Sequence, residues 1–149
     1  MKKVIITVKG IQVSADAPAE NTELTTEGEY RFADGCGSFT YEETALTGME
    51  GTTTRFDVTP GEVVISRSGT VSSRMVFVEG KKNVFLYHTP WGAMTMGIDT
   101  HKIKNTLKAH GGVLDIRYSL TFDHAMTTKN RFIVKIKEQA GEQINGKFD

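Results

Sequence analysis

The strongest structural signal in this chain is a strict alternation of apolar and polar residues along segment 114–122. Apolar side chains occupy every second position, and polar ones stand between them: Leu114, Ile116, Tyr118, Leu120 and Phe122. Successive side chains of a β-strand point to opposite faces, so this pattern predicts a strand with one face in a core and one in water. The same alternation recurs in segments 4–8 and 131–137.

The composition favours the same fold class. Val, Ile and Thr together supply 41 residues, whereas Leu supplies only 6. β-branched side chains lose rotamer freedom in helices and fit the pleated surface of a sheet. Turn-forming sequences rich in Gly and Pro separate the apolar stretches; they lie at 34–37, 59–61, 68–69, 79–81, 89–92 and 110–112.

About ten short strands joined by tight turns are typical of an up-and-down antiparallel meander. A long meander protects its edge strands best by closing on itself. We therefore predict an all-β fold, an antiparallel, closed or nearly closed barrel of about 8–10 strands. A chain of 149 residues suffices for one well-formed core and is too short for two domains of ordinary size, so one domain spanning 1–149 is expected.

Segment 92–108 interrupts the alternation. Its apolar residues change from even to odd positions between Ile98 and Ile103. A β-bulge near 99–101 would produce this change within one strand. The alternative is a short helix capped by Gly111, because the last two apolar residues are also four positions apart. We expect the strand.

Two segments lie outside the strand pattern. Segment 14–26 is polar, with a proline and several acids, and is predicted to be a long loop. Such a loop at the mouth of a barrel is either a lid over a ligand or a surface excursion. The polar segment 139–149 is expected to fray, as chain termini commonly do.

Charge and hydropathy exclude several classes of partner and location. The chain carries 18 acidic and 18 basic residues, so it lacks the basic excess that nucleic acids or anionic membranes attract. No segment approaches the roughly 20 apolar residues that cross a bilayer, and no signal-peptide pattern is present. We expect a cytoplasmic protein. Cys36 is the single cysteine, which excludes an internal disulfide and a cysteine-based metal site.

An ordered set of motifs runs along nearly the whole chain. It includes Ile65-Ser66-Arg67-Ser68-Gly69, Met75-Val76-Phe77, Tyr87-His88-Thr89-Pro90-Trp91-Gly92, Met96-Gly97-Ile98-Asp99-Thr100 and Gly111-Gly112 before Leu114–Leu120. This set resembles the bacterial YwiB-like family. The resemblance implies a calycin-like β-barrel, the architecture shared by lipocalins and fatty-acid-binding proteins. The family has no assigned reaction, so the resemblance implies a fold and no functional residue.

Calycin barrels often bind small apolar molecules inside. The predicted interior is rich in methionine, which adapts to irregular apolar ligands. It comprises Met75, Phe77, Met94, Met96, Ile98, Tyr118 and Leu120. The same residues would also simply fill a barrel without a cavity, and periodicity does not distinguish these two cases.

A polar set shares the inward face. Arg67 has the parity of the apolar residues before it, and Tyr87 has the parity of Phe85 and Thr89. Tyr41 and Glu43 share one face of their own strand. An unpaired buried charge is very costly, so the guanidinium is expected to meet either the carboxylate or an acidic ligand. The two interpretations are a ligand clamp and an ion pair that closes one barrel end. The predicted ligand-binding set is Arg67, Tyr87, Thr89, Tyr118, Met75, Phe77, Met94, Met96, Tyr41 and Glu43.

The remaining reactive side chains carry no prediction of catalysis. Cys36 stands between two glycines at an expected hairpin tip, with no histidine near it in sequence. Asp99 and His101 would share a strand face, but a bulge between them would separate them. His110 and His124 fall in expected turns. We predict no catalytic residue, no metal site and no cofactor.

These observations favour a non-enzymatic protein that binds a small apolar or amphipathic ligand, with an acidic end near Arg67 and Tyr87. The alternative is an interaction module or homodimer that uses outward apolar residues, namely Ile5, Val76, Val78 and Ile133. An enzyme using Tyr87, His88 or Arg67 is the third hypothesis, and it requires these groups to converge in an accessible pocket.

Overall fold

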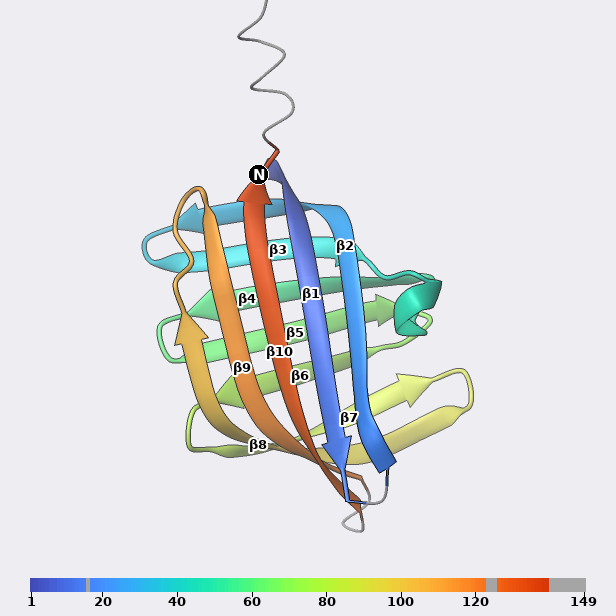
Figure 1. Cartoon of the computed structure of the whole chain (residues 1–149). Coiled ribbons are helices and arrows are strands. Elements are labelled where there is room, and N and C mark those ends of the chain that lie inside the picture. The colour runs from blue at the N-terminus through green and yellow to red at the C-terminus, as the bar shows by residue number, and fades with distance from the viewer. Residues whose placement is uncertain (16, 123–125, 140–149) are drawn as a thin grey trace, which may run out of the picture.

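The computed structural model describes residues 1–15, 17–122 and 126–139. These residues form ten β-strands and one short 3₁₀ helix, η1 (Ala45–Thr47) (Figure 1). The strands are β1 (Lys2–Ser14), β2 (Ala17–Ala33), β3 (Cys36–Glu42), β4 (Thr52–Thr59), β5 (Glu62–Gly69), β6 (Ser73–Val78), β7 (Lys82–Thr89), β8 (Gly92–Asn105), β9 (Gly111–Phe122) and β10 (Met126–Glu138). Within these ranges no helix is long and apolar enough to cross a membrane.

The strands form one antiparallel sheet that curls into a nearly closed barrel, as predicted. Its order is β6-β5-β4-β3-β2-β1-β10-β9-β8-β7, so the first and last strands of the chain pair with each other. A seam remains between β6 and β7. An isolated bridge crosses it, in which Ser72 N donates to His88 O at 3.0 Å and His88 N donates to Ser72 O at 2.9 Å. The Asn83 side-chain amide also donates across the seam, to the carbonyl oxygen of Val76 at 3.2 Å.

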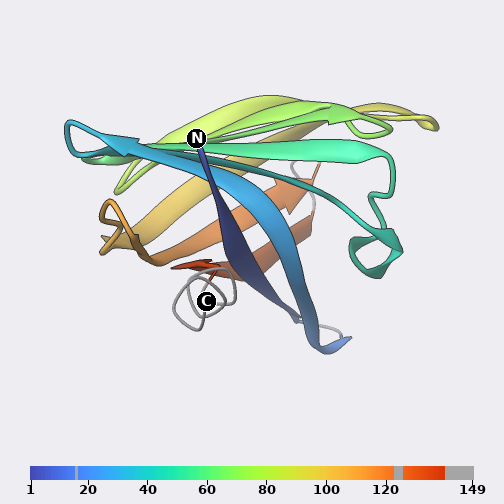
Figure 2. The ribbon, with the colours of Figure 1, turned by 90° about the horizontal axis from the view of Figure 1, so that it is seen from above.

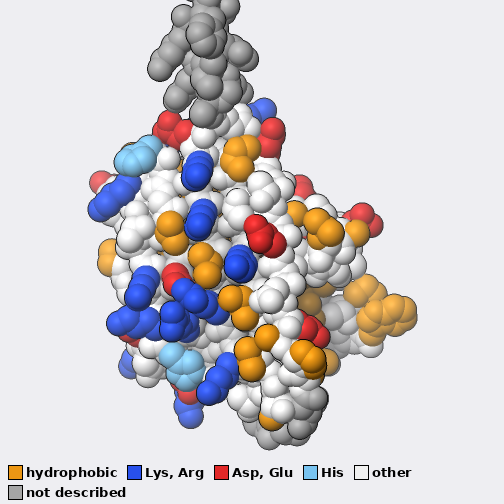
Figure 3. Space-filling view, in the orientation of Figure 1, with side chains coloured by type: hydrophobic (Ala, Val, Ile, Leu, Met, Phe, Trp, Pro, Cys, Tyr) orange, Lys and Arg blue, Asp and Glu red, His pale blue; other side chains and the backbone are white. Residues whose placement is uncertain are grey.

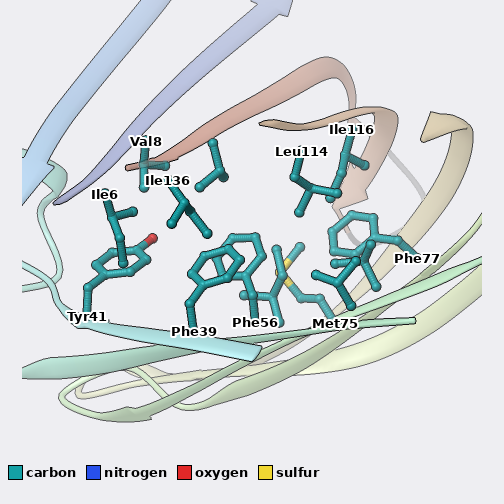
Figure 4. Packing of buried hydrophobic residues seen from close by; sticks show 14 of the residues in the cluster. Ile6, Val8, Phe39, Tyr41, Phe56, Met75, Phe77, Leu114, Ile116 and Ile136 are labelled. Atoms are coloured by element: carbon teal, nitrogen blue, oxygen red, sulfur yellow. The ribbon is translucent and has the colours of Figure 1, made fainter. Parts of the chain in front are cut away.

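The barrel is flattened, so that two groups of strands cross each other. In Figure 1, β1, β9 and β10 run steeply across β3, β4, β5 and β6, which lie behind them. β2 and β8 bend from one group into the other, and the view from above shows the two layers that result (Figure 2). Apolar side chains from both layers meet between them, including Ile6, Phe39, Phe56, Leu114 and Ile136 (Figure 4).

The strand predicted over segment 92–108 is confirmed, and the helical alternative is wrong. β8 extends to Asn105, and its pairing with β9 shifts register between Thr100 and Lys102. This bulge lies at the position near 99–101 that the change from even to odd apolar positions predicts. The chain then turns back into β9 through backbone hydrogen bonds between Lys108 and Gly111.

The long loop predicted over segment 14–26 is wrong, because Ser14 ends β1 and residues 17–26 form the first part of β2. It pairs with β1 from Ala17 opposite Ser14 to Thr26 opposite Ile6. Residues 17–23 are exposed on both faces, so their side chains show no apolar alternation. The neighbouring strand supplies backbone partners, which do not depend on side-chain polarity. The expectation that residues 139–149 fray falls almost entirely outside the described residues, and so does the turn expected at His124.

One end of the barrel is solidly filled. The largest fully buried side chains gather near the end that carries the turns before β3, β5, β7 and β9; they include Tyr30, Phe39, Phe56, Phe77, Ile65, Leu114 and Ile116. The hydroxyl of Tyr30 donates to the backbone oxygen of Lys108 at 2.7 Å. The rings of Phe39 and Phe56 stack at 4.5 Å between centroids. No ligand space remains where these rings pack.

Two strand glycines allow a matched test of this packing. A Cβ atom at Gly28 on β2 would collide with the Ile6 side chain and with the backbone oxygen of Thr40. A Cβ atom at Gly97 on β8 would meet only the Thr121 Cβ atom, at an ordinary 3.8 Å. We expect Gly28→Ala to lower the free energy of unfolding by about 1–3 kcal/mol, as overpacking does.

Gly97→Ala is expected to leave stability unchanged or raise it by up to about 1 kcal/mol, since alanine loses less backbone entropy than glycine. Urea unfolding followed by circular dichroism measures both variants. Equal stability of Gly28→Ala and the parent protein would contradict the close approach of β1, β2 and β3.

Candidate functional site

The opposite end of the barrel holds a cavity of about 370 Å³. The β1–β2 hairpin and the chain after β3 flank it. Its apolar lining comes from strands on both layers and includes Val8, Leu24, Met75, Phe85, Met96 and Leu120. Its polar lining includes Tyr41, Glu43, Arg67, Tyr87, Tyr118 and Asn130. The barrel is therefore hollow at one end and packed at the other.

Most of the side chains predicted to face a ligand do line this cavity. They are Arg67, Tyr87, Tyr118, Met75, Met96, Tyr41 and Glu43. Glu43 directly follows β3, and each of the others has the inward parity of its strand and lies in the half of the strand nearest the hollow end. Period-2 alternation was sufficient to identify their direction.

Three predicted residues lie elsewhere. Phe77 is fully buried beside Tyr118, with ring centroids 4.9 Å apart, and belongs to the packed core beyond the cavity. Met94 has the correct parity but is 40% exposed, because the pairing of β9 with β8 begins only at Met96. The hydroxyl of Thr89 accepts from Trp91 N at 3.1 Å and donates to Gly92 O at 3.0 Å, so this residue stabilises the β7–β8 turn.

A buried carboxylate with two hydroxyl partners lies in the cavity wall. The side chain of Glu43 is 1% exposed. Its Oε2 accepts a hydrogen bond from the Thr54 hydroxyl at 2.6 Å, and its Oε1 accepts one from the Thr47 hydroxyl at 2.9 Å. Hydrogen bonds to a charged acceptor are short and strong. Both carboxylate oxygens therefore have partners within the protein.

The guanidinium of Arg67 lies beside this carboxylate but is poorly supplied with acceptors. Its side chain is 7% exposed, and its Nε lies 3.9 Å from Glu43 Oε2, which is too long for a hydrogen bond. Its Nη1 donates to the sulfur of Met75 at 3.5 Å, a weak acceptor. Nε is buried with no hydrogen-bond partner in the described part of the chain. The site therefore contains a cation with one buried donor that the described part of the protein does not satisfy.

Two phenols share the electrostatic environment of Arg67. Burial raises the pKa of Tyr118 to about 12, and the Arg67 charge opposes this rise. Burial also raises the pKa of Tyr41 strongly, with the Glu43 charge adding to the rise and the Arg67 charge opposing it. Both hydroxyls are therefore protonated at neutral pH and can donate hydrogen bonds. The sequence placed Tyr41 and Tyr87 near Arg67, and the structure adds Tyr118 as a phenol whose pKa the Arg67 charge affects.

Sequence reasoning missed the threonines that hold Glu43 and the amide of Asn130. Thr54 stands directly opposite Arg67 in the β4–β5 ladder and has the parity of Phe56. Asn130 has the inward parity of Phe132 and Val134, and its Oδ1 is buried without a hydrogen-bond partner among the described residues. The alternation could have identified both positions as inward. It could not show that they lie beside a charged group on another strand.

The remaining reactive residues do not join the cavity. Cys36 is the half-buried first residue of β3, beside the predicted turn, and its Sγ lies 3.7 Å from the oxygen of Asp34. His110 lies in a turn, as expected. In residues 1–15, 17–122 and 126–139, no three side chains of His, Cys, Asp or Glu gather closely enough to hold a metal ion.

The support that Thr54 gives to the buried carboxylate can be measured. Thr54→Val keeps the side-chain shape and removes the hydroxyl, so we expect the free energy of unfolding to fall by about 1.5–3 kcal/mol, the range for a hydrogen bond to a charged group. Thr53→Val is the matched control, because this hydroxyl bonds the exposed carboxylate of Glu42 on the outer face of the same strand. Its effect should stay within about 0.5 kcal/mol. Urea unfolding measures the stability of both variants. Equal effects of the two variants would show that the hydrogen bond from Thr54 to Glu43 does not stabilise the protein.

Comparison with known proteins identifies a family and a fold. The sequence matches the family described as Domain of unknown function (DUF1934) over residues 6–134. No curated protein matches the sequence. The structure is similar to the crystal structure of the ywiB protein from Bacillus subtilis, with a TM-score of 0.75 and 22% sequence identity over 90% of this chain and 91% of that one. The resemblance to the YwiB-like proteins is confirmed, and the chain belongs to the DUF1934 family.

Proposed function

We propose that this protein is a non-enzymatic, cytoplasmic binding protein of the calycin type. Its ligand is a small amphipathic molecule with an anionic end, taken up in the cavity at the hollow end of the barrel. The anionic end is held by Arg67, and the apolar part lies against the methionine and aromatic side chains. Barrels of about eight strands or more enclose one small ligand in this way.

The observation that carries this proposal is the incomplete coordination of Arg67. If its sole role were to neutralise Glu43, the guanidinium would be expected to bind the carboxylate through two short hydrogen bonds. Instead the shortest approach is 3.9 Å, and the two carboxylate oxygens are taken by Thr47 and Thr54. A buried donor without an acceptor costs free energy. A carboxylate ligand supplies the missing acceptor.

The rest of the lining suits an apolar chain. Met75, Met96, Phe85 and Leu120 face the cavity, and methionine adapts to ligands of different shape. A volume of about 370 Å³ lies within the range of small-molecule sites. The protonated hydroxyl of Tyr118 offers a further donor to the anionic end. A few polar groups within a mainly apolar wall are typical of pockets that fix the orientation of a ligand.

We expect decanoate to bind more tightly than decanol, which has the same chain but no charge. The loss of a hydrogen bond to a charged group lowers affinity by about 10- to 100-fold. The double variant Glu43→Gln/Arg67→Met removes both charges together, which avoids leaving one buried charge unpaired. In this variant decanoate and decanol should bind equally. Isothermal titration calorimetry measures each dissociation constant.

The control is Arg55→Met, which removes an arginine from the neighbouring strand β4. Arg55 points outward and pairs with Asp57 at 3.0 Å, so its loss should leave decanoate binding unchanged. A thermal-shift measurement confirms that each variant is folded, because a ligand raises the melting temperature only by binding the folded state. Failure of decanoate and of other amphipathic acids to bind the parent protein would end the proposal.

A second candidate function is association with another copy of the chain. The predicted outward residues Ile5, Val76, Val78 and Ile133 are only half-buried. Val76 and Val78 lie on β6, whereas Ile5 and Ile133 lie on the paired strands β1 and β10, so the four form no single exposed patch. The β7–β8 hairpin instead exposes Val84 by 72% and Leu86 by 53%, with Trp91 exposed by 94% at its turn. Between Lys82 and His88 this outer face carries no charge on β7, so two copies could meet there without repulsion.

Val84→Ser/Leu86→Ser should convert a dimer into a monomer, because it removes the apolar area that the contact would bury. Leu46→Ser is the control, since Leu46 is 73% exposed on η1, away from the hairpin. Light scattering after size-exclusion chromatography measures the molecular mass. A parent protein that stays monomeric at every concentration would rule out this candidate and leave the cavity proposal untouched.

A further inference from the structure

Positive charge is concentrated on the outer face of β8, β9 and β10, which the zero net charge conceals. The outward basic residues are Lys102, Lys104, Arg117, Lys129, Arg131, Lys135 and Lys137. The outward carboxylates of the same region are those of Asp99 and Asp115. Figure 3 shows the Lys and Arg side chains gathered over these strands. The outer face of β2 carries acids instead, at Glu23, Glu27 and Glu29. The charges of the chain are therefore separated in space.

A shallow groove crosses this basic face. It runs over β8, β9 and β10 to the end of β1, and His101, Arg117, Ser119, Lys129 and Arg131 line it. Tyr118 and Asn130 lie directly opposite each other at its middle. Because both side chains point into the barrel, they contribute only backbone to the floor of the groove. The side chains of Arg117, Lys129 and Arg131 border this floor, and Ile11 and Val13 of β1 form the apolar end of the groove.

The pairing of β9 with β8 and with β10 places basic side chains next to one another, and the neighbouring carboxylates are too few to balance them. Arg117 lies directly opposite Arg131 on one side and Lys102 on the other, an arrangement that destabilises a sheet. Asp115 accepts from Arg131 through two hydrogen bonds of 3.0 and 2.7 Å, which lowers the pKa of its carboxyl. Within the described part of the chain, Arg117 and Lys129 have no ion pair with a carboxylate. A bound anion would balance these two charges.

The β8 bulge supplies a further donor to the groove. His101 is the extra residue between Thr100 and Lys102, and its Nε2 lies 2.7 Å from the Ser119 hydroxyl. β-bulges commonly re-aim a side chain next to a functional site. Without the extra residue, the side chains after Thr100 would continue the earlier alternation, and the register with Arg117 would be lost. The bulge thus brings the imidazole and the two unpaired cations into one groove.

We propose that this groove binds the linked phosphate groups of a small di- or triphosphate. Arg117 and Lys129 occupy diagonal positions on neighbouring strands, a separation of about 7–8 Å that both long side chains can bridge toward one ligand. The guanidinium fork binds two oxygens of one phosphate, and the ammonium binds an adjacent phosphate as a point charge. His101 and Ser119 complete the donor set. These four groups lie on the outer face of the barrel and do not line the cavity, although Arg131 lines both the groove and the cavity.

Inorganic tripolyphosphate is the probe, titrated by calorimetry in buffer without divalent cations at low and at physiological salt. Arg117→Gln/Lys129→Gln is expected to weaken binding by at least about 10-fold, because it removes two charge-assisted contacts. Lys135→Gln/Lys137→Gln is the matched control. It removes the same charge from the same face outside the groove, and it should weaken binding by less than about 3-fold through the loss of long-range attraction.

Three results would overturn the site. They are no binding of tripolyphosphate at millimolar concentration, equal weakening by the two double variants, and binding of single-stranded RNA that grows with its length while tripolyphosphate does not bind. The last two indicate a diffuse electrostatic surface. Glu43→Gln/Arg67→Met should bind tripolyphosphate as the parent does. The groove and the cavity therefore succeed or fail separately.

Discussion

The pairing of the first strand with the last is the constraint on which the structure depends. β1 and β10 run antiparallel from Val4 opposite Glu138 to Val13 opposite Lys129. Without this ladder the meander would be an open sheet whose edges expose unpaired backbone groups. With it, the sole interruption among the described strands is the seam between β6 and β7, which the bridge of Ser72 and His88 narrows. Because the sheet closes, it encloses an interior, and the cavity lies within this interior.

The two ends of this interior differ in chemistry because each strand changes character along its length. Toward the packed end, inward positions carry Phe, Ile, Leu and Val, and a single phenol hydroxyl reaches a backbone oxygen. Toward the hollow end, the chain buries Glu43 directly after β3, Thr54 on β4, Arg67 on β5 and Ser73 on β6. Burying such groups is costly unless they have partners. At Arg67 this satisfaction is incomplete, because its buried Nε has no hydrogen-bond partner among the described residues.

Much of this arrangement was predictable from local pattern. Alternation in segment 114–122, the β-branched composition and the evenly spaced turns gave the strand number and the antiparallel barrel. The parity change before Ile103 gave the bulge, and the parity of Arg67 and Glu43 gave their common direction. The alternation of apolar and polar residues failed to predict structure where a strand does not have one buried face and one exposed face. Residues 17–23 form a stretch of strand that is exposed on both faces, and Met94 projects beyond the strand that would have covered it.

The sequence by itself determined that this chain forms strands, and which side of each strand faces inward, because a period of two is a property of the backbone. Only the tertiary structure decided which inward residues meet. The distance from Arg67 to Glu43 depends on the register of three strands, and the capture of that carboxylate by Thr47 and Thr54 depends on the chain after β3. The same holds for the basic groove, where Lys102, Arg117 and Arg131 become neighbours only through the ladders that close the barrel.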